Sequence, residues 1–292
     1  MTKNIVIAVD IGERTRDALA LGRRLAECTH APTRIVTVLA HGAFADPAAP
    51  EMARLREQAG ATIAQRARET GLDDAVADVV PGNSAARELQ HVSERPDTGL
   101  IVVGSTQRGP VGRLLIGGVG ERLLAGGACP VAIAPRGYGD ESPGPLARVG
   151  VGLDGSEEAQ RALQAAVALA ESSGAELRVI TAFQALAFGG VTSSALVSTS
   201  ANDAMRTELR AAHDGALEAA GERVEASGLF SDGTADQVLV AETAELDLLV
   251  VGSRGYGPIG AVLMGSTTAV LARSAACPIL VTPRGTRFDL LG

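Results

Sequence analysis

The chain repeats itself, and this duplication limits the folds that its 292 residues can adopt. The segment IVIAVDIGERTRDALALGRRLAE, which begins at Ile5, is echoed by VGVGLDGSEEAQRALQAAVALAE from Val149. Further on, residues 104–137 and 252–285 are identical at fourteen of thirty-four positions, without a gap. Chance would give only a few identities over such a length. We therefore interpret the chain as two copies of one unit in tandem.

The offset between the copies locates their boundaries. Asp10 matches Asp154, 144 residues further on, and Gly104 matches Gly252, 148 residues further on. The Gly- and Pro-rich stretch YGDESPGPLA separates the two copies, and its composition is typical of a linker. We predict a first unit over residues 1–137, a linker over 138–147 and a second unit over 148–292.

Short apolar runs alternate with helical patterns in each copy. In the second copy, strands are predicted at Val149–Leu153, Leu177–Ala182, Val224–Ser231, Leu248–Gly252 and Ile279–Thr282. This alternation predicts an α/β fold in which each unit forms a doubly wound, five-stranded parallel sheet with helices on both faces. Because only 2% of the residues are aromatic, we expect a core of Val, Ile, Leu and Ala.

A glycine-rich loop follows the fourth predicted strand of the second copy. It has the form G-x2-G-x9-G-[ST] and runs from Gly252 through Gly255 and Gly265 to Ser266 and Thr267. Glycine lets the main chain approach a ligand without a Cβ in the way, and the free amides at a helix start attract anions. The pattern predicts a phosphate-binding loop at the carboxyl edge of the sheet. The alternative is a glycine-rich turn in which Ser266 caps the helix.

Three features together give a resemblance to a known family: the Asp after the first strand, the glycine loop and the closing Cys-Pro-aliphatic strand. The chain resembles a tandem universal stress protein of the ATP-binding branch over nearly its whole length. The resemblance implies the adenine nucleotide α-hydrolase-like fold, units that pack through their last strands or helices, and ATP in the second copy. Mg²⁺ would accompany ATP through the phosphates. The residues that the resemblance assigns to this site are Gly152, Asp154, Ala182, Phe183, Gly252, Ser253, Arg254, Gly255, Gly257, Gly265, Ser266 and Thr267.

The resemblance also implies a role for each part of this set. Asp154 and the Gly152 backbone would contact the adenine edge, and Ala182 or Phe183 would line the base pocket. The glycine loop and its Ser/Thr would surround the sugar and phosphates. Two alternatives remain open: Asp154 begins an Asp-Gly-Ser-Glu helix start, and Arg254 is an exposed surface residue.

The first copy departs from the glycine pattern. Gln107 stands where the second glycine belongs, and Gly118 stands where the second copy has Ser266. We predict a weaker site here, or a structural role as the partner half of a pseudo-dimer. The residues of this weaker site would be Asp10, Val38, Gly104, Gly117 and Gly118.

Composition excludes several classes of function. The net charge of −8 argues against nucleic acid and anionic membranes as partners. No apolar run of about 18 residues and no secretory signal is found, so we predict a cytoplasmic protein. The three Cys lack metal-ligand spacing and the four His are scattered, which predicts no metal site and favours packing roles.

The leading hypothesis is therefore an ATP-binding stress-response sensor or regulator with at most slow hydrolysis and no assigned catalytic residue. It would act through an unidentified protein partner, and a homodimer is compatible with it. A tandem interaction or scaffold protein without nucleotide is the first alternative, and a nucleotide-processing enzyme of similar fold is the second. The Ser/Thr/Ala-rich stretch Gly189–Ser200 is predicted as a loop, either a lid or disordered.

Overall fold

The computed structural model describes residues 3–11, 15–40, 49–105, 117–141, 143–185, 194–253, 265–286 and 288–291. In the first unit the elements are β1 (Asn4–Val9), α1 (Thr15–Thr29), β2 (Thr33–Ala40), α2 (Pro50–Glu69), β3 (Val76–Gly82), α3 (Ala85–Ser93), β4 (Thr98–Gly104), α4 (Gly118–Gly126) and β5 (Val131–Ala134). In the second unit they are β6 (Arg148–Gly152), α5 (Glu157–Ser173), β7 (Glu176–Phe183), α6 (Ser194–Gly221), β8 (Ala226–Asp232), α7 (Ala235–Glu242), β9 (Leu248–Gly252), α8 (Ser266–Ser274) and β10 (Ile279–Thr282).

The strands of both units join in one ten-stranded sheet, in the order β3-β2-β1-β4-β5-β10-β9-β6-β7-β8. Each half is parallel, and β8-β7-β6-β9-β10 repeats the internal order β3-β2-β1-β4-β5. The halves meet where β5 and β10 pair antiparallel, with Ile133 opposite Ile279 and Val131 opposite Val281. The predicted doubly wound units, and their packing through the last strands, are confirmed.

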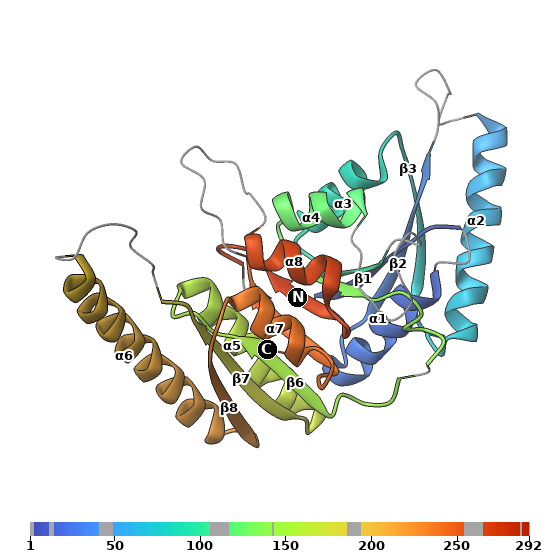
Figure 1. The fold of residues 1–292 in the computed structure, drawn as a ribbon. Helices are drawn as coiled ribbons and strands as arrows, with labels where there is room; N and C mark the ends of the chain where they lie inside the picture. The colour runs from blue at the N-terminus through green and yellow to red at the C-terminus, as the bar shows by residue number, and fades with distance from the viewer. Residues whose placement is uncertain are drawn as a thin grey trace.

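Helices cover both faces of the sheet (Figure 1). The helices α1, α2, α5 and α6 pack on one face, and α3, α4, α7 and α8 pack on the other. The order of the strands reverses between β1 and β4 in the first half and between β6 and β9 in the second. Ligands of open α/β sheets bind at such a reversal, outside the carboxyl ends of the strands.

Several predicted boundaries differ from the structure. The strands predicted at Val149–Leu153 and Leu177–Ala182 are β6 and β7, and their ends differ from the prediction by one residue. The strand predicted at Val224–Ser231 is β8, over Ala226–Asp232. The stretch Gly189–Ser200, predicted as a loop, contributes residues 194–200 to the start of α6, while 189–193 lie outside the described residues. This stretch holds only one Ala and one Leu, but the Ala-rich sequence that follows it continues the helix and outweighs the loop signal of the Ser and Thr residues.

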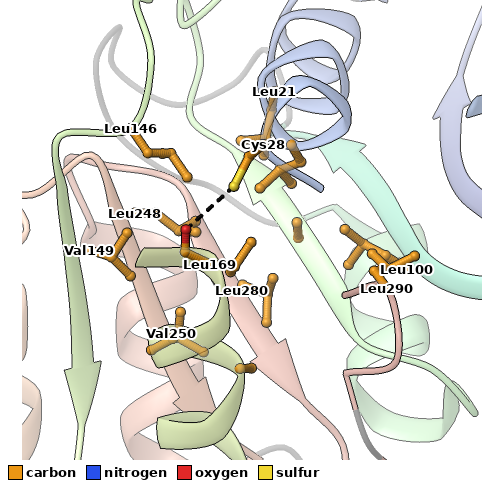
Figure 2. Packing of buried hydrophobic residues seen from close by; sticks show 14 of the residues in the cluster. Leu21, Cys28, Leu100, Leu146, Val149, Leu169, Leu248, Val250, Leu280 and Leu290 are labelled. Carbon is orange, nitrogen blue, oxygen red and sulfur yellow. Dashed lines mark hydrogen bonds between the residues drawn. The ribbon is translucent and has the colours of Figure 1, made fainter. Parts of the chain in front are cut away.

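An apolar cluster extends across the boundary between the units (Figure 2). Leu21 and Cys28 of α1 belong to it together with Leu146 of the connecting segment and Leu169 of α5. Cys28 Sγ donates a weak hydrogen bond to Leu169 O (3.5 Å). All four residues are buried, so on this face the two units share one core.

A buried ion pair crosses the same boundary. The guanidinium of Arg24, in α1, donates to Asp247 Oδ1 (2.9 Å), just before β9. Its other donors reach Tyr138 Oη and Pro145 O, both at 2.8 Å. Asp247 Oδ2 also accepts from the two backbone amides that lead into β6, at 2.9 and 2.8 Å. One side chain of the first unit thus holds the connecting segment and the start of β9 together.

The end of the chain returns to the first unit. Leu290 is buried against Gly99, where an added Cβ would lie only 2.6 Å from Leu290 Cδ2. Lys3 Nζ donates to Asp289 Oδ2 (3.1 Å). The segment after β10 therefore packs beside β1 and β4, outside its own unit.

One histidine is buried between α6 and the sheet. His213 is 2% exposed, and its Nδ1 lies 2.9 Å from Thr181 Oγ1 in β7. Its ring meets Phe230 edge on, with centroids 5.9 Å apart. Gly228 leaves room for the imidazole, because a Cβ there would lie 2.6 Å from Nε2. His213 is thus a packed core residue.

Acidification is expected to weaken the fold through His213. Burial lowers the pKa of this imidazole; the charge of Asp214 opposes the shift and that of Arg210 adds to it. The unfolded chain therefore binds a proton at His213 more readily than the folded chain does. The stability that the neutral, buried imidazole contributes is complete above about pH 6.5 and is lost as the pH falls toward the folded pKa. Urea unfolding should therefore show stability falling by up to about 1.4 kcal/mol per pH unit more steeply in the wild type than in His213→Gln. Equal pH slopes in the two proteins would contradict this account.

Candidate functional site

A pocket of ≈ 400 Å³ opens at the carboxyl ends of β6, β7 and β9 in the second unit. It lies at the reversal of strand order, and residues of α7 and α8 form its other walls. Its lining residues are Gly152, Leu153, Asp154, Ser156, Ala159, Ile180, Ala182, Ala235, Leu239, Val251, Gly252, Gly265, Ser266, Thr267 and Thr268. The residues assigned from the sequence that meet here are Gly152, Asp154, Ala182, Gly252, Gly265, Ser266 and Thr267.

Two assigned residues lie elsewhere. Phe183 follows Ala182 in β7 and so faces the other side of the sheet, where Arg206 Cζ lies 5.2 Å from its ring centroid. Ser253 is 3% exposed, and its amide already donates to Thr282 O (2.9 Å). Their expected contacts with the base and the phosphates are therefore not supported by this geometry. The assigned residues outside the described part of the chain are Arg254, Gly255 and Gly257.

Asp154 is held at the wall of the pocket by the start of α5. Its Oδ1 accepts hydrogen bonds from Ser156 N (3.0 Å) and Ser156 Oγ (2.5 Å). Ser156 in turn caps α5, because its Oγ accepts from Ala159 N (3.2 Å). The helix-start alternative for Asp154 thus describes a real local role. The same bonds orient the carboxylate beside the pocket that it lines.

The first turn of α8 forms the polar end of the pocket. Gly265 is the N-cap residue, and its carbonyl accepts from Ala269 N (2.9 Å). The alternative in which Ser266 caps the helix is therefore wrong, because Ser266 is the first helical residue. The amides of Ser266, Thr267 and Thr268 precede the first intrahelical bond, and this turn contains no acidic residue. These amides and the helix dipole favour an anion in the pocket.

Two glycines at the pocket serve different contacts. A Cβ at Gly252 would lie 2.7 Å from the carbonyl carbon of Glu158 in α5, which is backbone and cannot give way. Gly252 is therefore needed for the packing of β9 on α5. A Cβ at Gly152 would lie 3.1 Å from Leu239 Cδ1, a side chain of the pocket wall. At Gly152, the missing side chain keeps the pocket open.

Gly252→Ala is expected to lower the free energy of unfolding by about 1–3 kcal/mol, because the added methyl group must displace the backbone of α5. The matched control is Gly215→Ala in α6, where an added Cβ meets no described atom within 4 Å. This control should gain up to about 1 kcal/mol from its higher helix propensity. Urea unfolding measures both, and equal effects would refute the assigned contact.

Several lining residues were not identified from the sequence. Ser156 belongs to the Asp-Gly-Ser-Glu helix start and Thr268 directly follows the glycine loop, so their positions next to Asp154 and Thr267 were the available signal. Ala235 and Leu239 of α7 carry no such signal, because apolar residues of a helix are first interpreted as core.

The first unit places its assigned residues at equivalent points. Gly117 is the N-cap residue of α4, as Gly265 is of α8, and Gly118 is the first helical residue. Gln107 lies outside the described residues. The remaining residues, at or near the ends of their strands, are Asp10, Val38 and Gly104. Gly118 and Val119 replace the hydroxyl pair of the second unit, so this helix start keeps its amides without side-chain donors.

The cysteines are buried. Burial raises the pKa of Cys129 to about 12 and that of Cys277 to about 12, and it also raises the pKa of Cys28. These thiols therefore stay protonated near neutral pH, as packed residues do. In the described ranges, no group of three or more His, Cys, Asp or Glu side chains could hold a metal ion. No described helix combines the length and apolar character needed to span a membrane.

Comparison with known proteins identifies the family. A model of the Universal stress protein family matches residues 1–135 and again residues 146–283. The chain belongs to the universal stress protein family. This universal stress protein is 26% identical to one from Mycolicibacterium smegmatis, over 95% of its own length and 96% of that relative.

Two further relatives describe the range of similarity within the universal stress proteins. Universal stress protein Rv2005c of Mycobacterium tuberculosis is 30% identical over 188 residues, which cover 62% of this chain and 61% of that relative. The crystal structure of a universal stress protein from Archaeoglobus fulgidus superposes with a TM-score of 0.71 at 22% identity, covering 98% of this chain and all of that one. At this identity, the structural likeness shows the shared fold.

Proposed function

We propose that the second unit of this universal stress protein binds an adenine nucleotide, with ATP as the leading ligand, and that binding regulates a stress response. The observation that carries the proposal is the meeting of Asp154 and the first turn of α8 in one pocket. Its volume of ≈ 400 Å³ lies within the range typical of small-molecule sites. A carboxylate and free helix amides in one lining suit a ligand with an amino group and phosphates.

Apolar side chains supply much of the remaining lining. Ile180, Leu239 and Val251 are buried in the core on the α7 and α8 face of the sheet, and Ala182 adds a small side chain. A flat base fits between such walls, with its amino edge toward Asp154. The sugar and phosphates then extend toward Ser266 and Thr267, and Mg²⁺ accompanies them through phosphate oxygens.

The two units have different roles in this proposal. The second unit, over residues 148–292, binds the nucleotide. The first, over residues 1–137, acts mainly as its structural partner. Nucleotide bound at 100 times its Kd would stabilise the folded state by about 2.7 kcal/mol. Binding would change the surface around α8, which a protein partner, or a second copy of the chain in a cytoplasmic homodimer, would then recognise.

The test is to purify the chain without added ligand, denature it, and identify the released small molecules with their molar ratio. We expect about one adenine nucleotide per chain. A ratio near two would show that the first unit also binds. No released nucleotide, together with no heat on titration with ATP, would favour the scaffold alternative and end the proposal.

A further inference from the structure

A larger cavity lies on the opposite face of the sheet, in the first unit. It has a volume of ≈ 940 Å³ and extends along α1 between α2 and the segment that follows β5. Its walls include Thr15 and Arg23 of α1, Thr70 after α2 and Gly139 after β5. The nucleotide pocket proposed above belongs to the other unit and to the α7 and α8 face, so the two cavities are separate.

Four guanidinium groups line this cavity, although the chain has a net charge of −8. Arg16 and Arg23 lie seven residues apart on α1, about two turns or about 10 Å along the helix axis. Arg66 reaches in from α2, where its Nη1 donates to Thr15 Oγ1 (3.1 Å) and so is fixed at the wall. Arg136 follows β5 on the remaining side.

In the described part of the chain, two of the four groups, Arg16 and Arg23, take part only in weak ion pairs. The carboxylates in the lining are Asp17, Glu69 and Asp140, and Glu69 accepts from Gln65 Nε2 (3.0 Å). Asp17 accepts from the amides of Gly137 (3.1 Å) and Gly139 (2.8 Å), so it holds the backbone turn. Arg16 approaches Asp140 only to 3.8 Å, and both side chains are more than 70% exposed, which makes this pair weak. Arg23 Nη1 lies 3.3 Å from Glu27 Oε1, one turn along α1, in a partly exposed pair that is also weak. Arg23 Nε is buried and has no hydrogen-bond partner among the described residues.

The fold does not require arginine at these positions. The equivalent residues of α5, 144 positions further on, are Gln160 for Arg16 and Val167 for Arg23. The second unit forms the same helix on the same sheet without them. Arg16 and Arg23 are therefore a property of this cavity and not of the fold, whereas Arg136 has an equivalent, Arg284, in the second unit.

We propose that this cavity binds a small, non-aromatic molecule with two or more phosphate groups. A guanidinium group can donate two parallel hydrogen bonds to the oxygens of one phosphate. Because Arg16 and Arg23 lie about two turns apart on α1, they suit two separated phosphates better than a single ion. The described lining residues include no aromatic side chain, so a nucleobase would have no ring to stack on. An inorganic polyphosphate and a sugar bisphosphate share this chemistry.

The test uses calorimetric titration of the full chain with inorganic tripolyphosphate and, separately, with a hexose 1,6-bisphosphate. Both titrations use a Ser266→Asp background, which places a repelling charge at the phosphate end of the other pocket. We expect one site per chain for at least one probe. The tighter probe then identifies the class, inorganic polyphosphate or phosphorylated sugar.

The decisive variant is Arg16→Gln with Arg23→Val, which copies the residues of the second unit. It should weaken binding about tenfold or more. The matched control, Arg54→Gln with Arg87→Gln, removes the same charge from exposed positions outside the cavity and should change the affinity less than about twofold. If neither probe binds, or if the two double variants lose affinity equally, the proposal is overturned.

A second readout does not depend on these variants folding. Arginine modification by phenylglyoxal, mapped by mass spectrometry on the parent chain, should be slowed at Arg16 and Arg23 by the bound probe and unchanged at Arg54 and Arg87. Uniform protection of all four, or of none, would contradict a site in this cavity.

Discussion

Arg24→Met is expected to lower the free energy of unfolding by about 3 kcal/mol, the scale for breaking a buried ion pair. Arg24 has a side chain only 5% exposed, and its guanidinium donates to Asp247, Tyr138 and the Pro145 carbonyl. Methionine fills similar space but leaves these acceptors without their donor. Asp247 keeps its two backbone amides and is 31% exposed, so the loss should stay near the lower end of that scale.

The matched control is Arg148→Met, which breaks a neighbouring but exposed pair with Glu245. Its side chains are 53% and 67% exposed, so the expected change is below about 1 kcal/mol. Urea unfolding at pH 7 measures both variants. Equal losses, or a loss below about 1 kcal/mol for Arg24→Met, would show that this network does not hold the units together.

The effect of Arg24→Met should also depend on pH. Burial alone would raise the pKa of Asp247, but hydrogen bonds from Arg24 and from the two amides outweigh it and hold the pKa below its usual value. The stability that this carboxylate contributes is therefore present above its unfolded pKa and is lost as the pH falls through the folded one. Hence the difference between wild type and Arg24→Met should shrink below about pH 4.

Ser266→Asp is expected to reduce the affinity for ATP about a hundredfold or more without loss of stability. Ser266 is exposed in the first turn of α8, where an acidic side chain interacts favourably with the helix dipole and adds about 0.3–1 kcal/mol. The same charge lies where the phosphates are proposed to bind. Two like charges about 4 Å apart cost about 4 kcal/mol near a protein surface, and 1.4 kcal/mol is tenfold in affinity.

The control places the same residue at the equivalent position of the first unit. Gly118 is also the first residue of its helix, and an added Cβ there meets no described atom within 4 Å. Gly118→Asp should therefore leave ATP affinity unchanged if the second unit alone binds. Titration calorimetry compares the two. Retained affinity in Ser266→Asp, or a loss in Gly118→Asp instead, would contradict the assignment.

The fold could be predicted from the sequence because its signals are local and occur twice. Apolar runs, helical patterns and the linker define the units, and the last-strand pairing follows from the family resemblance. The start of α6 was not predicted, because Ser and Thr masked the helix formers around residues 194–200. The ion pair between Arg24 and Asp247 could not be predicted either. It joins residues 223 positions apart that share no motif.

The candidate site was predictable where its residues end strands or begin helices. Asp154, Gly265 and Ser266 are such residues, and all three line the pocket. Ser253 was assigned to the site, but the sequence pattern does not show that its amide donates to Thr282 O on a neighbouring strand. The sequence pattern places Gly252 in the loop whose main chain would approach the ligand. In the structure, its missing Cβ makes room for the backbone of α5.

The central claim concerns where a nucleotide binds, and a crystal structure of the full chain grown with excess ATP tests it most directly. We predict the base between β7 and α7 with its amino edge at Asp154, and the phosphates at the first turn of α8. An empty pocket at saturating ATP, or nucleotide bound only in the first unit, would contradict the account.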